Sequence, residues 1–309
     1  MLAAALAASS LAAAAYGAPV AGLALVGVTL AQAAVLTPSA PFADAIAVSA
    51  SARQGFSYGL PRGTGSAAFV LGTLASGALV TAFGWTAAAL AQAALLLAAS
   101  ALALRAPEPA ASVSAPSTDG WRDLLAIRPF RQIMLIAALV LGSHALHDGF
   151  ALIAWTQAGV SPRISSFLWS EGVVAEIAVF LLLGPWLLKR LGARGALALS
   201  LAAALLRWTT MAFTSAPEVM AFTEPLHGLT FALLHLACMD VIARNAPADL
   251  AASAQALYGA VAVGAANAVL TAASGSIFAR FGTGGFAFMA ALCLAAAPFV
   301  WTLREKPNG

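Results

Sequence analysis

Long apolar stretches follow one another along the chain, separated by glycine, proline and clusters of charged residues. A helix needs about 20 mostly apolar residues to cross a bilayer. The pattern predicts ten membrane helices, which cover residues 2–16, 19–50, 63–83, 85–104, 131–156, 165–188, 195–213, 218–243, 250–279 and 284–303. The first stretch is short, and the second is too long for one crossing, so its end near Pro38 and Pro41 should kink or leave the membrane.

The composition also indicates a membrane protein. Of the 309 residues, 61% are hydrophobic and 9% charged, with a mean hydropathy of +0.91, whereas soluble domains carry about 25% charged residues. The net charge of +3 is small and the basic residues are scattered, which argues against nucleic-acid binding. Cys238 and Cys293 lie in apolar stretches, so we expect no disulfide framework, no metal and no cofactor. The sequence has no GxxxxGK[ST], HExxH or GxSxG motif, so primary ATP-driven pumps and common hydrolases lack support.

Basic residues in the connections predict the orientation. One set of connections holds only Arg163 and Arg280. The other set holds Arg53, Arg62, Arg105, Arg122, Arg128, Arg131, Lys189, Arg190, Arg194, Arg244, Arg304 and Lys306. Because cytoplasmic loops are rich in lysine and arginine, we expect the second set and both termini in the cytoplasm of a bacterial-type inner membrane.

A polar connection over residues 106–130, rich in proline, serine and alanine, divides the chain. It separates a partial N-terminal bundle, residues 1–105 with four helices, from a six-helix C-terminal bundle, residues 131–304. Transporters built from two related bundles normally have equal halves, so two helices should precede this chain. No lysine or arginine occurs before Arg53, which argues against a cleaved signal peptide.

Ionisable residues within the apolar stretches are candidates for function, because such groups usually face a bundle interior or a water-filled cavity. The segment SHALHDGF places His144, His147 and Asp148 on one side of a helix. These three residues could line a cavity, or they could lie near the outer surface, where polar side chains reach water. Glu171 and Glu176 are about 140° apart around their helix. Glu176 lies deeper, where burial favours a neutral carboxyl, as a proton carrier requires.

Arg207 lies near the middle of its stretch and cannot lose its proton. It therefore needs an aqueous cavity or a carboxylate partner, for which Glu176, Glu224 and Asp148 are candidates. The pair could be purely structural, or Arg207 could bind a substrate anion through two parallel hydrogen bonds.

The stretch TEPLHGLTFALLHLACMD contains four polar groups. Projected on a regular α-helix, Glu224, His227 and His235 share one face, and Glu224 can contact His227. Asp240 falls on the opposite face, where we interpret it as an end-of-helix residue beside Arg244.

Glycines in YGLPRGTGSAAFVLG superficially match a dinucleotide fingerprint, but that motif requires a preceding strand, and the surroundings here are membrane helices. Gly65, Gly72 and Gly77 instead suggest close approach between helices.

Several segments together resemble the phenylpropionate permease branch of the major facilitator superfamily, which is related to lactose permease-type proton symporters. They are PSAPFADAIA, FSYGLPRGTGSAAFVLG, LWSEGVVAEIAVF, LLRW, PLHGLTFALLH, AQALYGA and ASGSIFARFG, spread over about residues 36–290. The resemblance implies an all-α polytopic fold of twelve helices, of which this chain would begin at the third. It also implies alternating access, with Glu176, Arg207 and His227 at places similar to the proton- and substrate-handling residues of sugar symporters. The acidic residue expected after the histidine is Thr230 here.

The leading hypothesis is a monomeric symporter that moves protons together with a small organic solute, such as the aromatic carboxylate phenylpropionate. Glu176, Arg207, His227, Glu224, Asp148 and His235 are its candidate site residues. Alternatives are a sugar or nucleoside symporter of the same superfamily and a non-functional truncated fragment. An intramembrane enzyme is disfavoured, because the polar groups are spread over four helices without metal-ligand spacing.

Overall fold

The computed structural model describes residues 2–18, 22–37, 39, 43, 46–47, 50, 54–55, 59–105 and 120–303. Over these ranges the elements are helices and no strand occurs. The chain divides into two compact units, Met1–Ala115 and Pro116–Gly309. The predicted connection falls at this division. Its residues 106–119 lie outside the described ranges, whereas residues 121–126 form helix α6 and α7 begins at Arg128.

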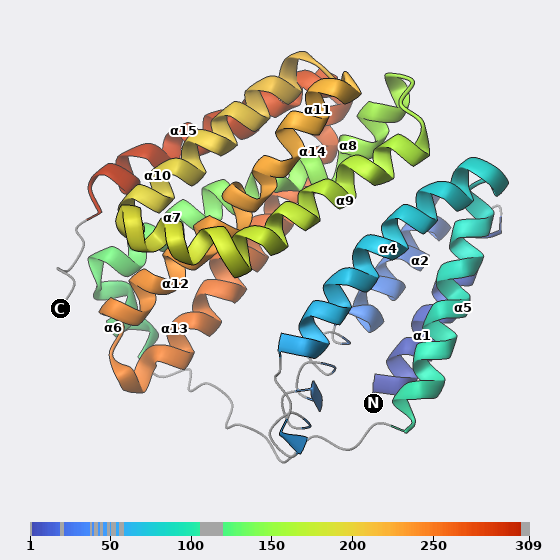
Figure 1. Ribbon diagram of the computed structural model, residues 1–309, viewed down its shortest axis with the longest axis horizontal. Helices are drawn as coiled ribbons and strands as arrows, with labels where there is room; N and C mark the ends of the chain where they lie inside the picture. Colours follow the sequence, from blue (N-terminus) through green and yellow to red (C-terminus); the bar gives the residue numbers. More distant parts are fainter. Residues whose placement is uncertain are drawn as a thin grey trace. The chain divides into compact units, whose positions relative to one another are not determined.

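The first unit contains four longer helices, α1 (Leu2–Ala15), α2 (Gly22–Leu36), α4 (Gly59–Phe83) and α5 (Trp85–Ala103), shown in Figure 1. Helices α1 and α5 pack side by side, and two serine hydroxyls fasten them. Ser10 Oγ donates to the Ala93 carbonyl at 2.7 Å, and Ser100 Oγ donates to the Ala3 carbonyl at 2.8 Å. Helix α2 ends at Leu36, two residues before Pro38, because a proline disfavours helical backbone in the preceding residue.

The glycines that the sequence suggested as packing points in α4 differ in their surroundings. Among the described residues, no atom lies within 4 Å of a Cβ placed on Gly65 or Gly72, while Gly77 is buried. Close approach of another helix at Gly65 and Gly72 therefore stays a prediction. Among the described glycines, the tightest contacts occur in the second unit, at Gly142, Gly184 and Gly228.

The second unit is a helical bundle (Figure 1). Its elements are α6 (Trp121–Ala126), α7 (Arg128–Gly142), α8 (His144–Gln157), α9 (Pro162–Ala178), the π-helix η1 (Val179–Leu183), α10 (Gly184–Phe213), α11 (Pro217–Thr223), the 3₁₀-helix η2 (Glu224–Leu226), the π-helix η3 (Gly228–Leu233), α12 (Leu234–Asn245), the 3₁₀-helix η4 (Ala248–Leu250), α13 (Ala251–Leu257), the π-helix η5 (Tyr258–Ala265), α14 (Ala266–Phe281), the 3₁₀-helix η6 (Gly282–Gly285) and α15 (Phe286–Trp301).

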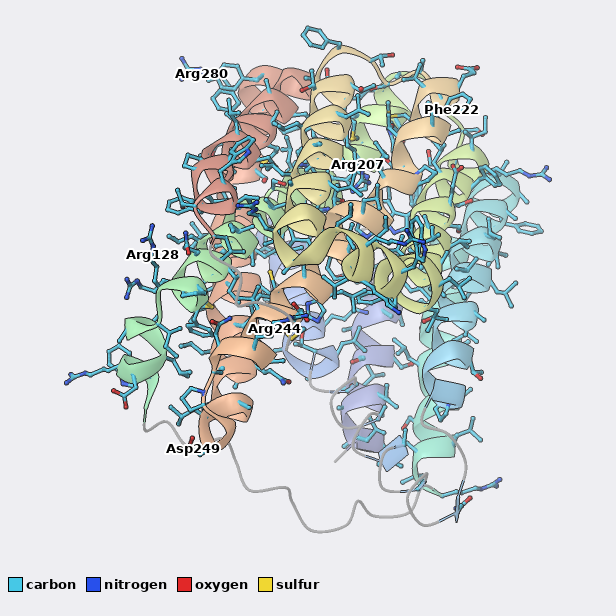
Figure 2. The ribbon with its side chains drawn as sticks, turned by 60° about the vertical axis from the view of Figure 1, so that its left-hand side comes forward. Arg128, Arg207, Phe222, Arg244, Asp249 and Arg280 are labelled. Atoms are coloured by element: carbon cyan, nitrogen blue, oxygen red, sulfur yellow. The ribbon has the colours of Figure 1, made fainter. Side chains whose placement is uncertain are left out.

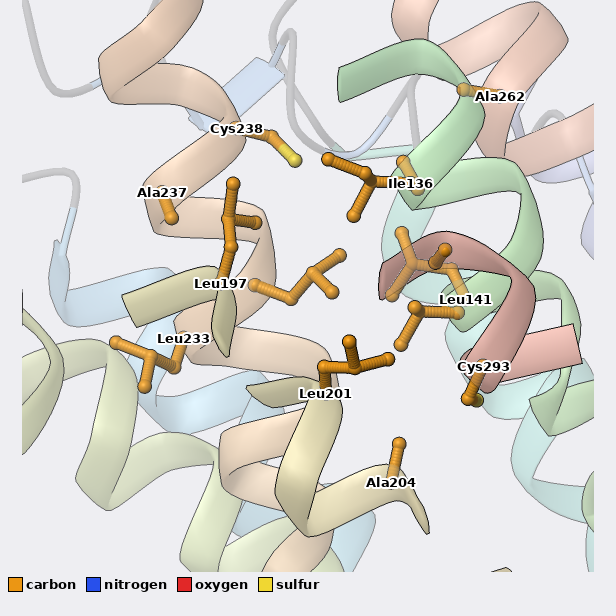
Figure 3. Close-up of a cluster of buried hydrophobic side chains, with 14 of the residues drawn as sticks. Ile136, Leu141, Leu197, Leu201, Ala204, Leu233, Ala237, Cys238, Ala262 and Cys293 are labelled. Carbon is orange, nitrogen blue, oxygen red and sulfur yellow. The ribbon is translucent and has the colours of Figure 1, made fainter. Parts of the chain in front are cut away.

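The core of this unit is formed where α7, α10, α12 and α15 meet. On α7, Ile133, Ile136, Ala137 and Val140 are fully buried, and their spacing places them on one face of the helix. Figure 3 shows side chains from the four helices and from η3 and η5 pointing toward one another. This packing fixes α7 and α10, which border the site described below.

Six helical runs in the described ranges are long and apolar enough to cross a membrane, rather than the ten separate helices predicted. Two pairs of predicted helices are joined into continuous runs, Pro162–Phe213 of 52 residues and Ser253–Trp301 of 49 residues. Each run exceeds one bilayer thickness, and each contains a glycine with left-handed backbone, Gly192 at φ 69° and Gly282 at φ 55°. Helices α1 and α2, with 14 and 15 residues, are shorter than a full span.

Candidate functional site

A cavity of about 250 Å³ lies inside the second unit, and four helical segments supply most of its polar lining. It is lined by Leu141, His144, His147, Asp148, Trp169, Gly172, Val173, Arg207, Glu224, His227, Phe231, Val263 and Asn267. The histidines and carboxylates come from α8 and from the segment around η2 and η3, while Arg207 comes from α10. Four of the six candidate residues from the sequence, Asp148, Arg207, Glu224 and His227, thus line one cavity.

Arg207 is the cation of the site and lies within the bundle (Figure 2). Its Nη2 donates to Glu224 Oε2 at 2.6 Å, and both side chains are only 1% exposed. The guanidinium carbon also lies 4.7 Å from the centre of the Trp208 ring. Of the three carboxylates suggested by the sequence, Glu224 is therefore the direct partner. Such a buried pair avoids the large cost of an uncompensated charge.

His227 links Arg207 to Glu176. Its Nδ1 lies 3.2 Å from Arg207 Nη1, and its Nε2 lies 3.3 Å from Glu176 Oε2. A guanidinium only donates hydrogen bonds, so Nδ1 accepts and Nε2 carries the hydrogen that is donated to Glu176. The Glu176 side chain is 24% exposed, so this line of contacts runs from the buried arginine to a partly open carboxylate.

His147 links Arg207 to Asp148 on another side. Its Nε2 lies 3.1 Å from Arg207 Nη2 and 3.2 Å from Glu224 Oε2, and its Nδ1 lies 3.2 Å from Asp148 Oδ1. The ring stacks on Trp169 with centroids 5.0 Å apart and 21° between the planes. These contacts on both edges and on one face hold the imidazole in a single orientation.

His144 belongs to the supporting layer of the site. Its Nδ1 donates to the Val140 carbonyl at 3.0 Å, which leaves Nε2 to accept from Thr230 Oγ1 at 2.9 Å. Thr230, at the place where the family resemblance implied an acidic residue, is thus a buried hydroxyl that orients a histidine. Beside it, Trp208 Nε1 donates to Ser143 Oγ at 2.8 Å, which fixes the ring under Arg207.

Two glycines allow α9 to lie close against the segment that carries Glu224 and His227. A Cβ at Gly228 would lie 2.6 Å from the Ala175 carbonyl oxygen, and a Cβ at Gly172 would lie 3.4 Å from the Glu224 carbonyl oxygen. The short 3₁₀-helix at Pro225 and the π-helix that follows give this segment an irregular backbone, which in membrane proteins is found where it is buried or lines a cavity.

Among the described residues, three buried polar atoms of the lining have no hydrogen-bond partner: Arg207 Nε, Glu224 Oε1 and Asn267 Oδ1. One is a donor and two are acceptors, so the cavity offers unused hydrogen bonds to a polar ligand or to water. Within the described ranges, no group of three or more histidine, cysteine, aspartate or glutamate side chains has an arrangement suited to a metal ion.

Five of the six candidate residues from the sequence are brought together: Glu176, Arg207, His227, Glu224 and Asp148. His235 is the exception, because it lies outside the cavity lining and contacts Tyr258 Oη at 3.3 Å through Nδ1. The projection that placed it on the same face as Glu224 assumed a regular α-helix, whereas η2 and η3 change the number of residues per turn.

Asp240 forms an i,i+4 pair with Arg244 at 2.7 Å, in agreement with its interpretation as an end-of-helix residue. Sequence reasoning considered His147 only as one of several residues on its helix, and it missed Trp169 and Asn267 altogether. The adjacency of a histidine and an aspartate in LHD was the signal that could have singled out His147.

Comparisons with known proteins agree with this picture. The model of the MFS_1 like family matches residues 1–290. The chain is 34% identical over 265 residues to the probable 3-phenylpropionic acid transporter of Escherichia coli (strain K12), an alignment covering 84% of this chain and 69% of that protein. It is 27% identical over 284 residues to the maltose permease of Geobacillus stearothermophilus, covering 91% of this chain and 71% of the relative. The chain therefore belongs to the MFS_1 like family, and it is a multi-pass membrane transporter rather than an enzyme.

Proposed function

We propose that this chain is a proton-coupled symporter that moves a small organic anion by alternating access, and that its substrate is an aromatic carboxylate such as 3-phenylpropionate. The observation that carries the proposal is the buried guanidinium of Arg207 at a cavity, in contact with two histidines and a carboxylate. A permanent cation in an apolar bundle is costly, and a transporter of anions has a use for it.

The lining of the cavity supports an aromatic carboxylate. Arginine binds carboxylates through two parallel hydrogen bonds, and within the described ranges the Nε of Arg207 has no partner. Trp169 and Phe231 also line the cavity, and aromatic side chains favour offset or edge contacts with another ring. The name of the Escherichia coli relative, a probable 3-phenylpropionic acid transporter, points to the same class of solute.

The contact of Glu176 with His227 supports proton coupling. Glu176 is the partly exposed end of the line that leads through His227 to Arg207. A carboxyl in this position can exchange protons with water while its charge is felt at the arginine. In this proposal Glu176 carries the transported proton to and from water, and His227 and Glu224 couple it to the anion.

The test is uptake of radiolabelled 3-phenylpropionate by cells that express the Glu176→Gln variant. We expect this variant to lose accumulation driven by the proton gradient and to retain exchange of internal for external substrate. Asp240→Asn is the matched control, because it also removes one intramembrane carboxylate but lies at the Arg244 pair outside the cavity. Full accumulation by Glu176→Gln would remove Glu176 from the mechanism.

A sugar is the second candidate substrate, because the other relative is a maltose permease. Glu224 Oε1 and Asn267 Oδ1 are unused acceptors that sugar hydroxyls could satisfy. A nucleoside would use the same acceptors. Competition of unlabelled maltose, uridine and 3-phenylpropionate against labelled 3-phenylpropionate separates these solutes, and inhibition by the carboxylate alone is the expected result.

The basic residues of the connections support an inner-membrane protein with both termini in the cytoplasm. A C-terminal fusion to alkaline phosphatase, which is active only outside the cytoplasm, is expected to be inactive. An active fusion would reverse the proposed orientation.

A further inference from the structure

His147 contacts both Arg207 and Glu224, but the proposed function gives it no role. Its Nε2 faces two groups of opposite character, the donor Nη2 of Arg207 at 3.1 Å and the acceptor Oε2 of Glu224 at 3.2 Å. Its Nδ1 faces the acceptor Oδ1 of Asp148 at 3.2 Å. The His147 side chain is 5% exposed, whereas Asp148 is 53% exposed on the same helix.

One imidazole nitrogen cannot satisfy both neighbours at once. Neutral His147 donates from Nδ1–H to Asp148 and accepts at Nε2 from Arg207. Protonated His147 keeps the bond to Asp148 and donates from Nε2–H to Glu224 instead. Both arrangements are reached with the ring in place, because Trp169 holds its face and the two oxygens lie at equal distances.

Protonation of His147 would free hydrogen-bond donors of Arg207 for a ligand. The Nε and Nη2 of a guanidinium lie on one edge and together form the fork that grips a carboxylate. Glu224 accepts through Oε2 from Nη2, one of the two nitrogens of this edge, while Arg207 Nε and Glu224 Oε1 have no partner among the described residues. Glu224 therefore accepts a single hydrogen bond from Arg207, whereas a substrate carboxylate could accept two from the same guanidinium.

We propose that His147 takes up one proton when the anion binds, and that the resulting imidazolium holds Glu224 so that the Nε and Nη2 edge of Arg207 is free for the substrate carboxylate. This inference rests on the proposed symport of an organic anion. This proton is separate from the one that Glu176 exchanges: it comes from water and forms the Nε2–H bond of His147, and the hydrogen bond from Arg207 to His147 breaks. When the anion leaves, the proton returns to water and Glu224 pairs with Arg207 again.

Charge balance gives the reason for one proton per anion. Without substrate, Arg207 and Glu224 neutralise each other in a region where both are almost fully buried. An added anion would leave one negative charge uncompensated, which is costly in such a place. The other titratable groups around His147 are Asp148 and His144 on α8, His227 after η2, and Glu171 and Glu176 on α9. Of these, Glu176 and His227 pair with each other, and His144 is held by Val140 and Thr230.

The test is calorimetric titration of the purified full chain with 3-phenylpropionate in two buffers of different ionisation enthalpy, which counts the protons taken up on binding. The wild type is expected to take up about one proton per anion, so that affinity falls about tenfold per pH unit where His147 is neutral in the free protein. His147→Gln keeps a group that can accept from Arg207 but cannot become a cation. It is expected to bind more weakly, with no proton uptake and no dependence on pH.

Two further variants separate this role from a structural one. His147→Arg supplies a cation that cannot lose its proton, so binding should persist without proton uptake. Glu176→Gln should keep proton uptake on binding although it loses accumulation. Proton uptake that survives in His147→Gln, or that disappears in Glu176→Gln alone, would overturn the role of His147 and leave the symport proposal standing. Absence of binding to the wild type would instead overturn the proposed substrate, and this inference with it.

Discussion

The ion pair between Arg207 and Glu224 makes a quantitative prediction about stability. Both side chains are 1% exposed and joined at 2.6 Å, so removing either one leaves a buried charge without its main partner. Breaking such a pair typically costs about 3–5 kcal/mol, whereas replacing both members by uncharged residues is often nearly neutral. We therefore expect Arg207→Met and Glu224→Gln each to be strongly destabilising, and the double variant to be much closer to the wild type.

Thermal denaturation of the four purified proteins in one detergent measures this effect. At roughly 2 °C per kcal/mol for a chain of this size, the single variants should melt about 6–10 °C below the wild type. The double variant should recover most of the loss, because the coupling between residues in contact is not additive. The pair would be refuted as a stabilising unit by losses that simply add in the double variant, or by single variants that melt like the wild type.

Two other contacts of the site give further predictions. Gly228→Ala would place a Cβ 2.6 Å from the Ala175 carbonyl oxygen, so we expect overpacking to lower the free energy of unfolding by about 1–3 kcal/mol. The control is Gly172→Ala, because a Cβ at Gly172 has its nearest contact at 3.4 Å. Equal melting temperatures of the two variants would contradict the described contact between the helices. Ser143→Ala removes the acceptor of Trp208 Nε1 and should lower stability by about 1–3 kcal/mol, measured by the same denaturation, while an unchanged melting temperature would mean that the indole is satisfied otherwise.

The sequence predicts the class of the protein well because membrane helices can be recognised from their apolar composition and length alone. The long apolar stretches of the second unit correspond to helices α7 to α15. The need of Arg207 for a carboxylate partner or an aqueous cavity also follows from the chemistry of arginine, which cannot become neutral. These conclusions depend on the apolar character of the bilayer and on the chemistry of single residues, not on the packing of one helix against another.

The choice among partners could not be made in the same way, because it depends on helix geometry that the sequence does not state. A regular helix would place His235 on the same face as Glu224, but η2 and η3 change the number of residues per turn, and His235 contacts Tyr258 instead. Similarly, glycines in a helix do not reveal which of them meets another backbone. Gly228 does so and Gly72 does not, among the residues described.

The contacts of His147 with Arg207 and Glu224 could not be predicted from the sequence for a related reason. A histidine near a helix end has an ordinary interpretation as an interface residue, and only its contacts with Arg207 and Glu224, distant in sequence, set it apart. Asp148 follows His147 directly in the sequence, but the contact of His147 with the second carboxylate, Glu224, requires the fold.

The central claim is that this chain uses a proton gradient to concentrate an organic anion, and accumulation in proteoliposomes tests it most directly. Vesicles containing the wild-type chain are given an alkaline interior and external radiolabelled 3-phenylpropionate, with Arg207→Gln vesicles and protein-free vesicles as controls. We predict that wild-type vesicles accumulate the anion above the level in both controls, and that a protonophore abolishes the difference. Accumulation by the wild type that is the same with and without the pH gradient, or no greater than that of Arg207→Gln, would contradict the account.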